Sequence, residues 1–143
     1  MLVSTKGRYA LRVMLDLAEH DSGAPLLLMD IAQRQEISEK YLEGIMAVLS
    51  RHGYVLAQRG RGGGYRLTRP PESYTAGSIL RLIEGSLSPV SCLDSAPNAC
   101  PRSVSCRTLP MWTELSNVIN RYLDSMTLAD LLAQGSNLDG AGI

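Results

Sequence analysis

The sequence predicts a mainly α-helical fold with one small β-hairpin, and three observations support this prediction. Two short amphipathic helical segments, 28–35 and 39–52, are separated by a tight connection. Two β-prone segments, 54–58 and 64–68, follow directly and enclose a glycine-rich turn. An apolar stripe of helical period then runs through 111–123. This order is that of a winged helix-turn-helix with a long C-terminal helix, and 143 residues accommodate one such domain with an appendage.

The N-terminal segment 9–18 has the periodicity of an amphipathic helix. Ser4 or Thr5 is expected to supply the hydroxyl that caps its start. A turn signal, Asp21-Ser22-Gly23-Ala24-Pro25, ends this first unit. The face expected to be buried consists of Leu11, Met14, Leu15 and Ala18.

The next two helices are predicted with only Glu36 and Ile37 between them. Ser38 is expected to cap the second helix, and Glu39 places an acid in its first turn, where the helix dipole favours negative charge. Gly53 is expected to end this helix, because glycine tolerates the left-handed backbone that closes a helix. The apolar stripe of the second helix is Tyr41, Leu42, Ile45, Met46 and Leu49.

A basic, mobile tip is predicted for the hairpin. The segment between the strands is Arg59-Gly60-Arg61-Gly62-Gly63, which has the glycines that tight hairpin turns require. Pro70 and Pro71 then interrupt regular structure. Thr75 is expected to cap a further helix that ends at Glu84.

The C-terminal part begins with a loop, 85–107, that carries every cysteine. Thr108 is expected to cap the long helix, and Pro110 fits its first turn. The apolar stripe of this helix allows two interpretations, burial against its own domain or burial against a symmetry mate. Thr127 and Asp130 have the spacing of a capping box at the start of a short last helix.

The overall composition is that of an ordinary globular protein, with 45% hydrophobic and 20% charged residues. It excludes a disordered chain, a collagen-like chain and a coiled-coil rod. No apolar run reaches the ~18 residues that a membrane span needs, and the N-terminus lacks the apolar core of a signal peptide. We therefore expect a cytoplasmic protein that does not associate with a membrane.

Charge is distributed unevenly along the chain, although the formal net charge is zero. Five arginines and no acid occur between Arg51 and Arg69. Three basic residues and no acid occur between Lys6 and Arg12. A neutral chain with two such blocks can still present a basic face, which suits the phosphate backbone of nucleic acid.

The helix-turn-helix, the hairpin and the basic blocks together indicate double-stranded DNA as a partner. The second helix would lie in the major groove, and the hairpin tip would approach the backbone or the minor groove. The tip alone fits a solvated turn equally well, and it lacks the Gly-Lys-Ser/Thr ending of a nucleotide-binding P-loop. The residues expected at DNA are Lys6, Arg8 and Tyr9, then Ser38, Glu39, Lys40, Tyr41 and Glu43, and finally Arg59, Arg61, Gly62 and Gly63.

Three cysteines lie in one loop, with seven residues between Cys92 and Cys100 and five between Cys100 and Cys106. An odd number of cysteines in a cytoplasmic chain does not indicate a disulfide framework. Thiolates bind iron–sulfur clusters or zinc, and two thiols can form a redox switch. Arg102 and Arg107 would stabilise thiolates. The spacing by itself leaves these three interpretations open, together with a fourth in which the cysteines are inert.

Four segments of the chain carry a specific resemblance. They are 4–11 (STKGRYAL), 37–43 (ISEKYLE), 59–65 (RGRGGGY) and 76–80 (AGSIL). Together they resemble the IscR/NsrR/CymR-type family of bacterial winged helix-turn-helix transcription regulators. The resemblance covers about residues 1–134.

The resemblance implies a homodimer that forms through the long C-terminal helix, here matched by about 108–125. It also implies an iron–sulfur cluster, [2Fe–2S] or [4Fe–4S], bound by Cys92, Cys100 and Cys106. Some relatives supply a histidine three residues after the third cysteine, where this chain has Leu109. Others use a residue from the N-terminal helix of the partner subunit, near the position of Arg8. The fourth ligand therefore stays unknown.

The expected function is that of a homodimeric regulator that binds a palindromic operator and senses redox state, nitric oxide or cluster supply. Alternatives are a thiol-switch regulator, a zinc-stabilised regulator, a regulator that responds to a partner protein, and an iron–sulfur scaffold or carrier. The sequence shows no nucleophile–base pair and no carboxylate dyad with a distinctive spacing, so we do not expect an enzyme. The expected organisation is a DNA-binding domain at 1–86, a sensor loop at 87–107, the dimerisation and last helices at 108–134, and a flexible tail at 135–143.

Overall fold

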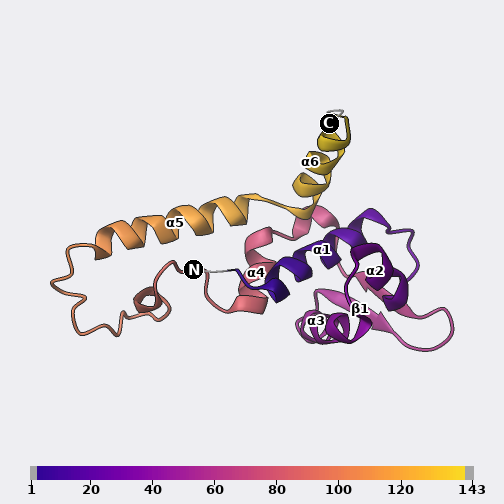
Figure 1. Ribbon diagram of the computed structural model, residues 1–143, viewed down its shortest axis with the longest axis horizontal. Coiled ribbons are helices and arrows are strands. Elements are labelled where there is room, and N and C mark those ends of the chain that lie inside the picture. The colour runs from indigo at the N-terminus through magenta and orange to yellow at the C-terminus, as the bar shows by residue number, and fades with distance from the viewer. Residues whose placement is uncertain (1–2, 141–143) are drawn as a thin grey trace.

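The computed structural model describes residues 3–140 and confirms the mainly helical fold with one antiparallel hairpin. A body of helices and the hairpin lies at one end of the molecule, and an arm made of the cysteine-bearing loop and α5 extends from it (Figure 1). The elements in chain order are α1 (Thr5–Glu19), α2 (Leu28–Gln35), α3 (Glu39–Arg51), β1 (Val55–Gln58), β2 (Gly64–Leu67), the 3₁₀ turn η1 (Pro71–Ser73), α4 (Ala76–Glu84), the 3₁₀ turn η2 (Ser91–Leu93), α5 (Leu109–Ser125) and α6 (Leu128–Gly140).

The core of the body is centred on α1, which packs against α2, α4 and α6. Because neighbours cover α1 on several sides, its most buried face differs from the expected one. Leu11, Leu15 and Ala18 are only partly buried, whereas Met14 is fully buried as expected. The residues of α1 that lie deepest in the core are Ala10, Val13, Met14 and Leu17.

The tight connection between α2 and α3 is anchored to α1 by a buried acid. Asp16 is 1% exposed, and its carboxylate accepts hydrogen bonds from Arg34 Nε at 3.0 Å and Arg34 Nη2 at 2.7 Å. Gln35 Nε2 adds a third hydrogen bond at 2.8 Å. The hydrogen bond with Asp16 raises the pKa of the Arg34 guanidinium above its ordinary value. This network orients the helix-turn-helix relative to α1, since a buried carboxylate requires all of its partners.

Helix α3 starts and ends as its sequence predicts. The Ser38 hydroxyl accepts a hydrogen bond from Tyr41 N at 3.2 Å, which is the expected N-cap. At the other end, Gly53 adopts a φ of 74° and Tyr54 N donates to Leu49 O at 2.8 Å. This closure turns the chain directly into β1.

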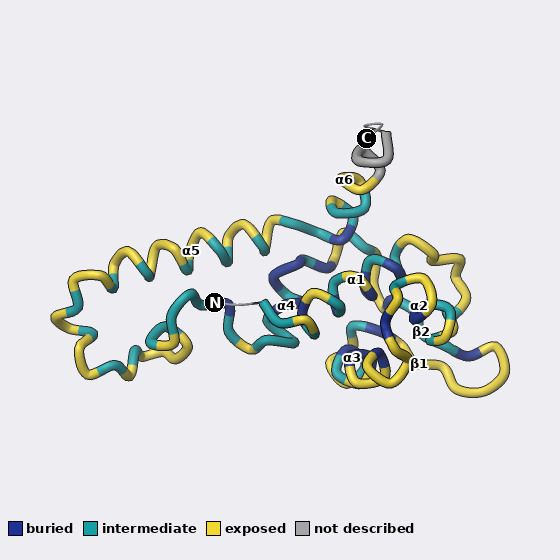
Figure 2. The backbone as a smooth tube through the Cα atoms, in the orientation of Figure 1, coloured by how far each residue is buried: buried dark blue, intermediate teal, exposed yellow. Residues whose placement is uncertain are grey.

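The hairpin is fixed to the body by Tyr74, which is fully buried. Its hydroxyl donates to Tyr54 O at 2.7 Å and accepts from the backbone nitrogens of Thr68 and Arg69, both at 3.1 Å. These three contacts hold the base of the hairpin beside the core, where Val55 pairs with Leu67. The tip, in contrast, is exposed along almost its whole length (Figure 2).

Helix α5 has no buried residue, and it extends away from the body (Figure 2). Its contact with the body is made through α4, where Arg81 Nη1 donates to Asn120 Oδ1 at 2.8 Å and Arg81 also pairs with Asp124. The link from α5 to α6 is held by a bridge of two backbone hydrogen bonds, Ala76 N to Met126 O at 2.7 Å and Leu128 N to Tyr74 O at 3.0 Å.

The C-terminal part agrees only in part with the expectations. Thr108 is the N-cap residue of α5 as expected, but its hydroxyl makes no cap hydrogen bond and contacts the Cys106 thiol instead. The expected tail is helical as far as Gly140, because α6 continues through Gly135, and an internal glycine costs a helix only ~1 kcal/mol. The rest of that tail, 141–143, lies outside the described residues. The capping box is confirmed by reciprocal hydrogen bonds between Thr127 and Asp130, each 3.0 Å.

Within residues 3–140, no helix combines the length and apolar character that crossing a bilayer requires.

Candidate DNA interface and cysteine loop

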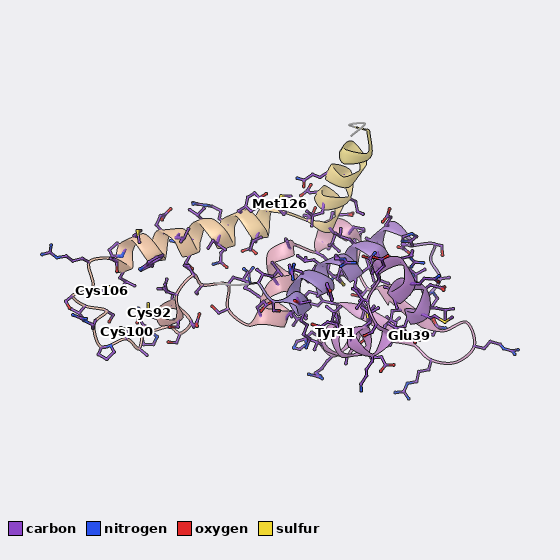
Figure 3. The ribbon with its side chains drawn as sticks, in the orientation of Figure 1. Glu39, Tyr41, Cys92, Cys100, Cys106 and Met126 are labelled. Atoms are coloured by element: carbon purple, nitrogen blue, oxygen red, sulfur yellow. The ribbon has the colours of Figure 1, made fainter. Side chains whose placement is uncertain are left out.

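The N-terminal part of α3 presents a polar surface on the side away from the core. Leu42, Ile45, Met46 and Leu49 of this helix are buried, so its other face is free. Figure 3 shows Glu39 and Tyr41 on the outer edge of the body. The exposed residues on this surface are all five of those expected from the sequence: Ser38, Glu39, Lys40, Tyr41 and Glu43.

The start of α1 adjoins this surface through an aromatic contact. The rings of Tyr9 and Tyr41 are 5.6 Å apart at an interplanar angle of 75°, an edge-to-face arrangement. Arg12 lies with its guanidinium carbon 5.1 Å from the centre of the Tyr9 ring. Arg8 is exposed and Lys6 is half-buried. The contact between Tyr9 and Tyr41 therefore brings the start of α1 next to the exposed face of α3.

Arg12 belongs to this surface but was not among the residues predicted to contact DNA. It also donates from Nε to Gln35 Oε1 at 3.2 Å and from Nη2 to the Gln35 carbonyl oxygen. Its guanidinium thus joins α1 to the end of α2 while remaining exposed. The available signal was its spacing of three residues from Tyr9, which places both side chains on one side of a helix.

The hairpin tip carries two exposed arginines, Arg59 and Arg61. Gly60 and Gly62 have φ values of 89° and 77°, a backbone region that favours glycine. Gly63 differs from the expectation of an exposed contact residue, because it is buried. Its N–H donates to Gly60 O at 2.9 Å, and a side chain there would collide with the carbonyl oxygens of Gln58 and Gly60. Gly63 therefore shapes the turn.

A groove of about 480 Å³ separates α3 from the hairpin. Glu43 lines it from the helix, Gln58 and Arg59 line it from the hairpin, and Leu27 lines it from the residue before α2. Helix α3 and the hairpin thus border one recess. A carboxylate and a guanidinium within the same recess can each select the chemical group that approaches, by attraction or by repulsion.

The cysteine loop lies at the far end of the arm, away from α3 (Figure 3). Cys92, Cys100 and Cys106 are free thiols of intermediate exposure. Figure 3 shows all three in the loop at the end of the arm, and the described residues contain no group of three or more His, Cys, Asp or Glu side chains arranged to hold a metal ion. The loop carries the expected donors without a preassembled ligand set.

Cys106 has the most polarised surroundings in the loop. Its Sγ lies 3.3 Å from Thr108 Oγ1, and this hydrogen bond, with a smaller contribution from the nearby Arg102 charge, holds the pKa of the thiol below its ordinary value. The thiol opens into a shallow pocket of about 230 Å³ that Arg107 also lines. Thiolate is the form that binds metals and reacts with electrophiles.

Asn98 was not predicted as a site residue, yet it contacts a cysteine directly. Its Oδ1 accepts a hydrogen bond from Cys100 N at 2.8 Å. Its Nδ2 is buried and has no hydrogen-bond partner among the described residues. The sequence signal was an asparagine two residues before a cysteine, a spacing at which the side chain can hydrogen-bond to the backbone.

The donor set suits a thiolate-bound iron–sulfur group. Three unpaired thiols, one of them with a lowered pKa, share a loop with a buried N–H donor that lacks an acceptor. Sulfur ligands of such groups accept hydrogen bonds from amide N–H groups. Leu109 begins α5 and offers no donor atom for a fourth ligand position.

Comparison with known proteins gives consistent matches over nearly the whole chain. The model of the Rrf2 family, described as "Iron-dependent Transcriptional regulator", matches residues 3–134. The protein rrf2 of Nitratidesulfovibrio vulgaris is 40% identical over 136 residues, which are 95% of this chain and 90% of that protein.

Solved structures show the same similarity. The global cysteine regulator CymR of B. subtilis has a TM-score of 0.76 and 36% identity, covering 94% of this chain and 98% of that one. IscR of T. potens has a TM-score of 0.75 and 41% identity, covering 94% of this chain and 88% of that one. These similarities confirm the resemblance that the four sequence segments predicted.

Proposed function

Because the chain belongs to the Rrf2 family of transcriptional regulators, we propose that it binds a palindromic operator as a homodimer and carries an iron–sulfur cluster on its cysteine loop. The chain is a DNA-binding regulator and not an enzyme. As a regulator of transcription it acts where the DNA is, in the cytoplasm of a bacterial cell.

One observation supports the DNA contacts most strongly. The exposed residues of α3, the start of α1 and the hairpin tip border one another, through the Tyr9–Tyr41 contact on one side and the groove at Glu43 and Arg59 on the other. In this arrangement α3 enters the major groove, while arginines of the hairpin reach the backbone or minor groove. The residues of α1 contact flanking phosphates, which position the protein without reading sequence.

The exposed stripe of α5 supports the homodimer. Met111, Leu115, Val118 and Tyr122 are 55%, 40%, 44% and 62% exposed, and they recur at steps of four, three and four residues. This is the spacing of the apolar seam in paired helices. An isologous two-fold pairing of α5 would bury the stripe and relate two copies of α3 by the symmetry of a palindromic operator.

Cys92, Cys100 and Cys106 are the residues that would hold the cluster, and the fourth ligand is open. When bound, the cluster would supply a site whose occupancy depends on redox state, nitric oxide or cluster supply. The description of the matching family as iron-dependent supports this assignment. Thiolates in place of thiols are required for binding, and Thr108 and Arg102 favour the thiolate of Cys106.

Helix α4 is the element through which the cysteine loop would influence DNA binding. The loop starts directly after Glu84, and Glu84 contacts Ser4 at the start of α1. Arg81, one turn earlier, contacts Asn120 and Asp124 of α5. A rearrangement of 85–107 would therefore displace α1 and α5 relative to each other. Such a coupling requires different DNA affinities in the two states, typically by ~1–3 kcal/mol.

The experiment that tests this function combines chemical analysis with DNA binding. Protein purified without oxygen is examined by visible absorption and assayed for iron and acid-labile sulfide. We expect a brown protein with both elements, whose affinity for its operator changes when the cluster is removed. If Cys92→Ala, Cys100→Ala and Cys106→Ala each bind the operator like the wild type under reducing and oxidising conditions, the sensing function is wrong.

A thiol switch is the second candidate, and the lowered pKa of Cys106 is the observation that favours it. In this case, two thiols form a disulfide on oxidation and the third stays free. A colourless protein that contains neither iron nor sulfide after anaerobic reconstitution, but forms an intramolecular disulfide, supports the switch. Zinc content measured on the same sample tests the zinc-stabilised alternative. An iron–sulfur carrier, in contrast, would bind a cluster on the cysteine loop and hand it on. Its function would not require the arginines of the hairpin.

A further inference from the structure

The side-chain Nδ2 of Asn98 is buried and has no hydrogen-bond partner among the described residues. The DNA-binding and dimerisation functions leave this unpaired donor unexplained. We infer that this Nδ2 amide group donates a hydrogen bond to a sulfur atom of the occupied cysteine site, so that Asn98 is a positioning residue for that site. The inference rests on the proposed cluster function. It goes beyond it by assigning a role to a residue that is not itself a cluster ligand.

The orientation of the Asn98 amide is fixed by its neighbour. Cys100 N–H is a donor, so the atom 2.8 Å from it must be the acceptor Oδ1. The opposite end of the amide is therefore Nδ2, which carries two N–H donors. An interchange of the two ends would place a donor against a donor. The location of the unpaired N–H groups thus follows from the hydrogen bond to Cys100.

A buried N–H group without an acceptor is unfavourable, and folded proteins contain few of them. Among the described residues only Ser50 Oγ and Asn98 Nδ2 are buried side-chain polar atoms without a partner. Ser50 lies in α3, whereas Asn98 lies between Cys92 and Cys100. An unpaired donor inside the cysteine loop indicates that its acceptor arrives with the ligand.

The position of the donor selects sulfur as that acceptor. The amide is hydrogen-bonded through Oδ1 to the backbone of Cys100, one of the three proposed ligands, so its Nδ2 donor belongs to the same short stretch of the loop as that thiol. Thiolate and inorganic sulfide are both anionic acceptors of N–H hydrogen bonds, and such bonds raise the reduction potential of iron–sulfur groups. By bonding to Cys100 through Oδ1 and to a sulfur atom through Nδ2, the Asn98 side chain would orient the cysteine loop around the cluster.

The test compares three variants of the full chain. Asn98→Asp keeps the acceptor for Cys100 N and loses the donor, but adds a negative charge. Ala99→Asp adds the same charge at the next, exposed position and leaves Asn98 intact. Asn98→Ala adds no charge and removes both donor and acceptor. The two Asn98 variants therefore share only the loss of the Nδ2 donor.

Each variant is reconstituted without oxygen, and its iron and sulfide content, midpoint potential and loss of cluster to a chelator are measured. We expect Asn98→Asp to have a lower midpoint potential than Ala99→Asp, and Asn98→Ala to have a lower one than the wild type. We also expect both Asn98 variants to retain the cluster against the chelator less well, by roughly 10- to 100-fold, as for other partners of metal ligands. Thermal unfolding of the cluster-free proteins checks that all variants fold, and their affinity for DNA in this form should match that of the wild type.

Binding of Co²⁺ to the cluster-free protein identifies the sulfur. If both Asn98 variants weaken Co²⁺ binding and shift its thiolate absorption bands, the acceptor is a cysteine thiolate. If they change only the cluster-loaded protein, the acceptor is inorganic sulfide. Equal potentials and equal retention in Asn98→Asp and Ala99→Asp would overturn the inference while the wild type still holds a cluster. A wild type that binds no iron or sulfide would overturn the proposed function and, with it, this inference.

Discussion

The carboxylate of Glu84 accepts two hydrogen bonds from Ser4, although the two residues are 80 positions apart in the chain. Glu84 Oε1 lies 2.9 Å from Ser4 N and 2.5 Å from Ser4 Oγ. Ser4 in turn caps α1 by accepting from Gly7 N at 3.1 Å. The last residue of α4 thus places a negative charge at the positive end of α1, where the helix dipole favours it.

This contact also explains a glycine in α1. A side-chain carbon at Gly7 would collide with the Glu84 carboxylate and contact Val3, so glycine permits the close approach of the two helix ends. Gly77 has the same role on the other side of α4, where a side chain would collide with Asp124 of α5. Both ends of α4 therefore depend on close contacts with other helices.

Replacement of Glu84 tests this contact. Glu84→Ala removes both hydrogen bonds to Ser4 and the charge at the start of α1, and we expect the free energy of unfolding to fall by about 2 kcal/mol. Glu84→Gln keeps an acceptor oxygen and should lower it by less than ~1 kcal/mol. Urea unfolding measures both values, with Glu72→Ala as a control at an exposed acid in η1. Equal stability of Glu84→Ala and Glu72→Ala would contradict a structural role for the contact.

The hairpin arginines provide a test of the DNA interface. Arg59→Ala combined with Arg61→Ala should weaken binding to the operator and to unrelated DNA, because both side chains would contact the backbone or a narrow minor groove. Each lost phosphate contact should make the negative slope of log K against log salt concentration less steep by ~0.9. Fluorescence anisotropy titrations between low and moderate salt give these slopes. Arg121→Ala, at an exposed arginine of α5, should leave the affinity and its salt dependence unchanged.

The exposed stripe of α5 predicts the response of the dimer to a buried charge. Val118→Glu would place a carboxylate inside the proposed helix pair, where an unpaired charge is strongly unfavourable. We expect sedimentation velocity to show a dimer for the wild type and a monomer for Val118→Glu, with loss of operator binding. Thr113→Glu carries the same charge on the opposite side of α5 and should stay dimeric. A dimeric Val118→Glu protein would exclude this face of α5 as the interface.

The lowered pKa of Cys106 predicts a reactive thiol in the loop. Because the Thr108 hydroxyl stabilises the thiolate, a larger fraction of Cys106 is ionised at neutral pH than in an ordinary cysteine. In cluster-free protein, we expect iodoacetamide to modify Cys106 faster at neutral pH than it modifies the cysteine of a short unstructured peptide. The midpoint of its rate against pH should lie below 9.0, the ordinary value for this thiol.

Thr108→Val removes the hydroxyl and should move that midpoint upward, so that the alkylation rate at neutral pH falls. Thr113→Val, at an exposed position of α5, serves as the control and should not change the profile. Peptide mapping by mass spectrometry assigns the modification to each cysteine. If Thr108→Val leaves the profile unchanged, the hydroxyl does not stabilise the thiolate.

Much of the fold follows from interactions between residues three or four positions apart, and such interactions are visible in a sequence. Ser38 caps α3 through Tyr41 N, and Thr127 pairs with Asp130 at the start of α6, as their spacing indicates. The exposed candidates on α3 likewise follow from the positions of its apolar residues. Local geometry decides these features, because a helix brings residues at that spacing together regardless of the remaining chain.

The features that connect the site with the rest of the molecule arise from packing between distant segments. The Glu84–Ser4 contact and the rotation of the buried face of α1 depend on where neighbouring elements lie. No periodicity encodes these contacts, since they form only when elements far apart in the chain meet in three dimensions.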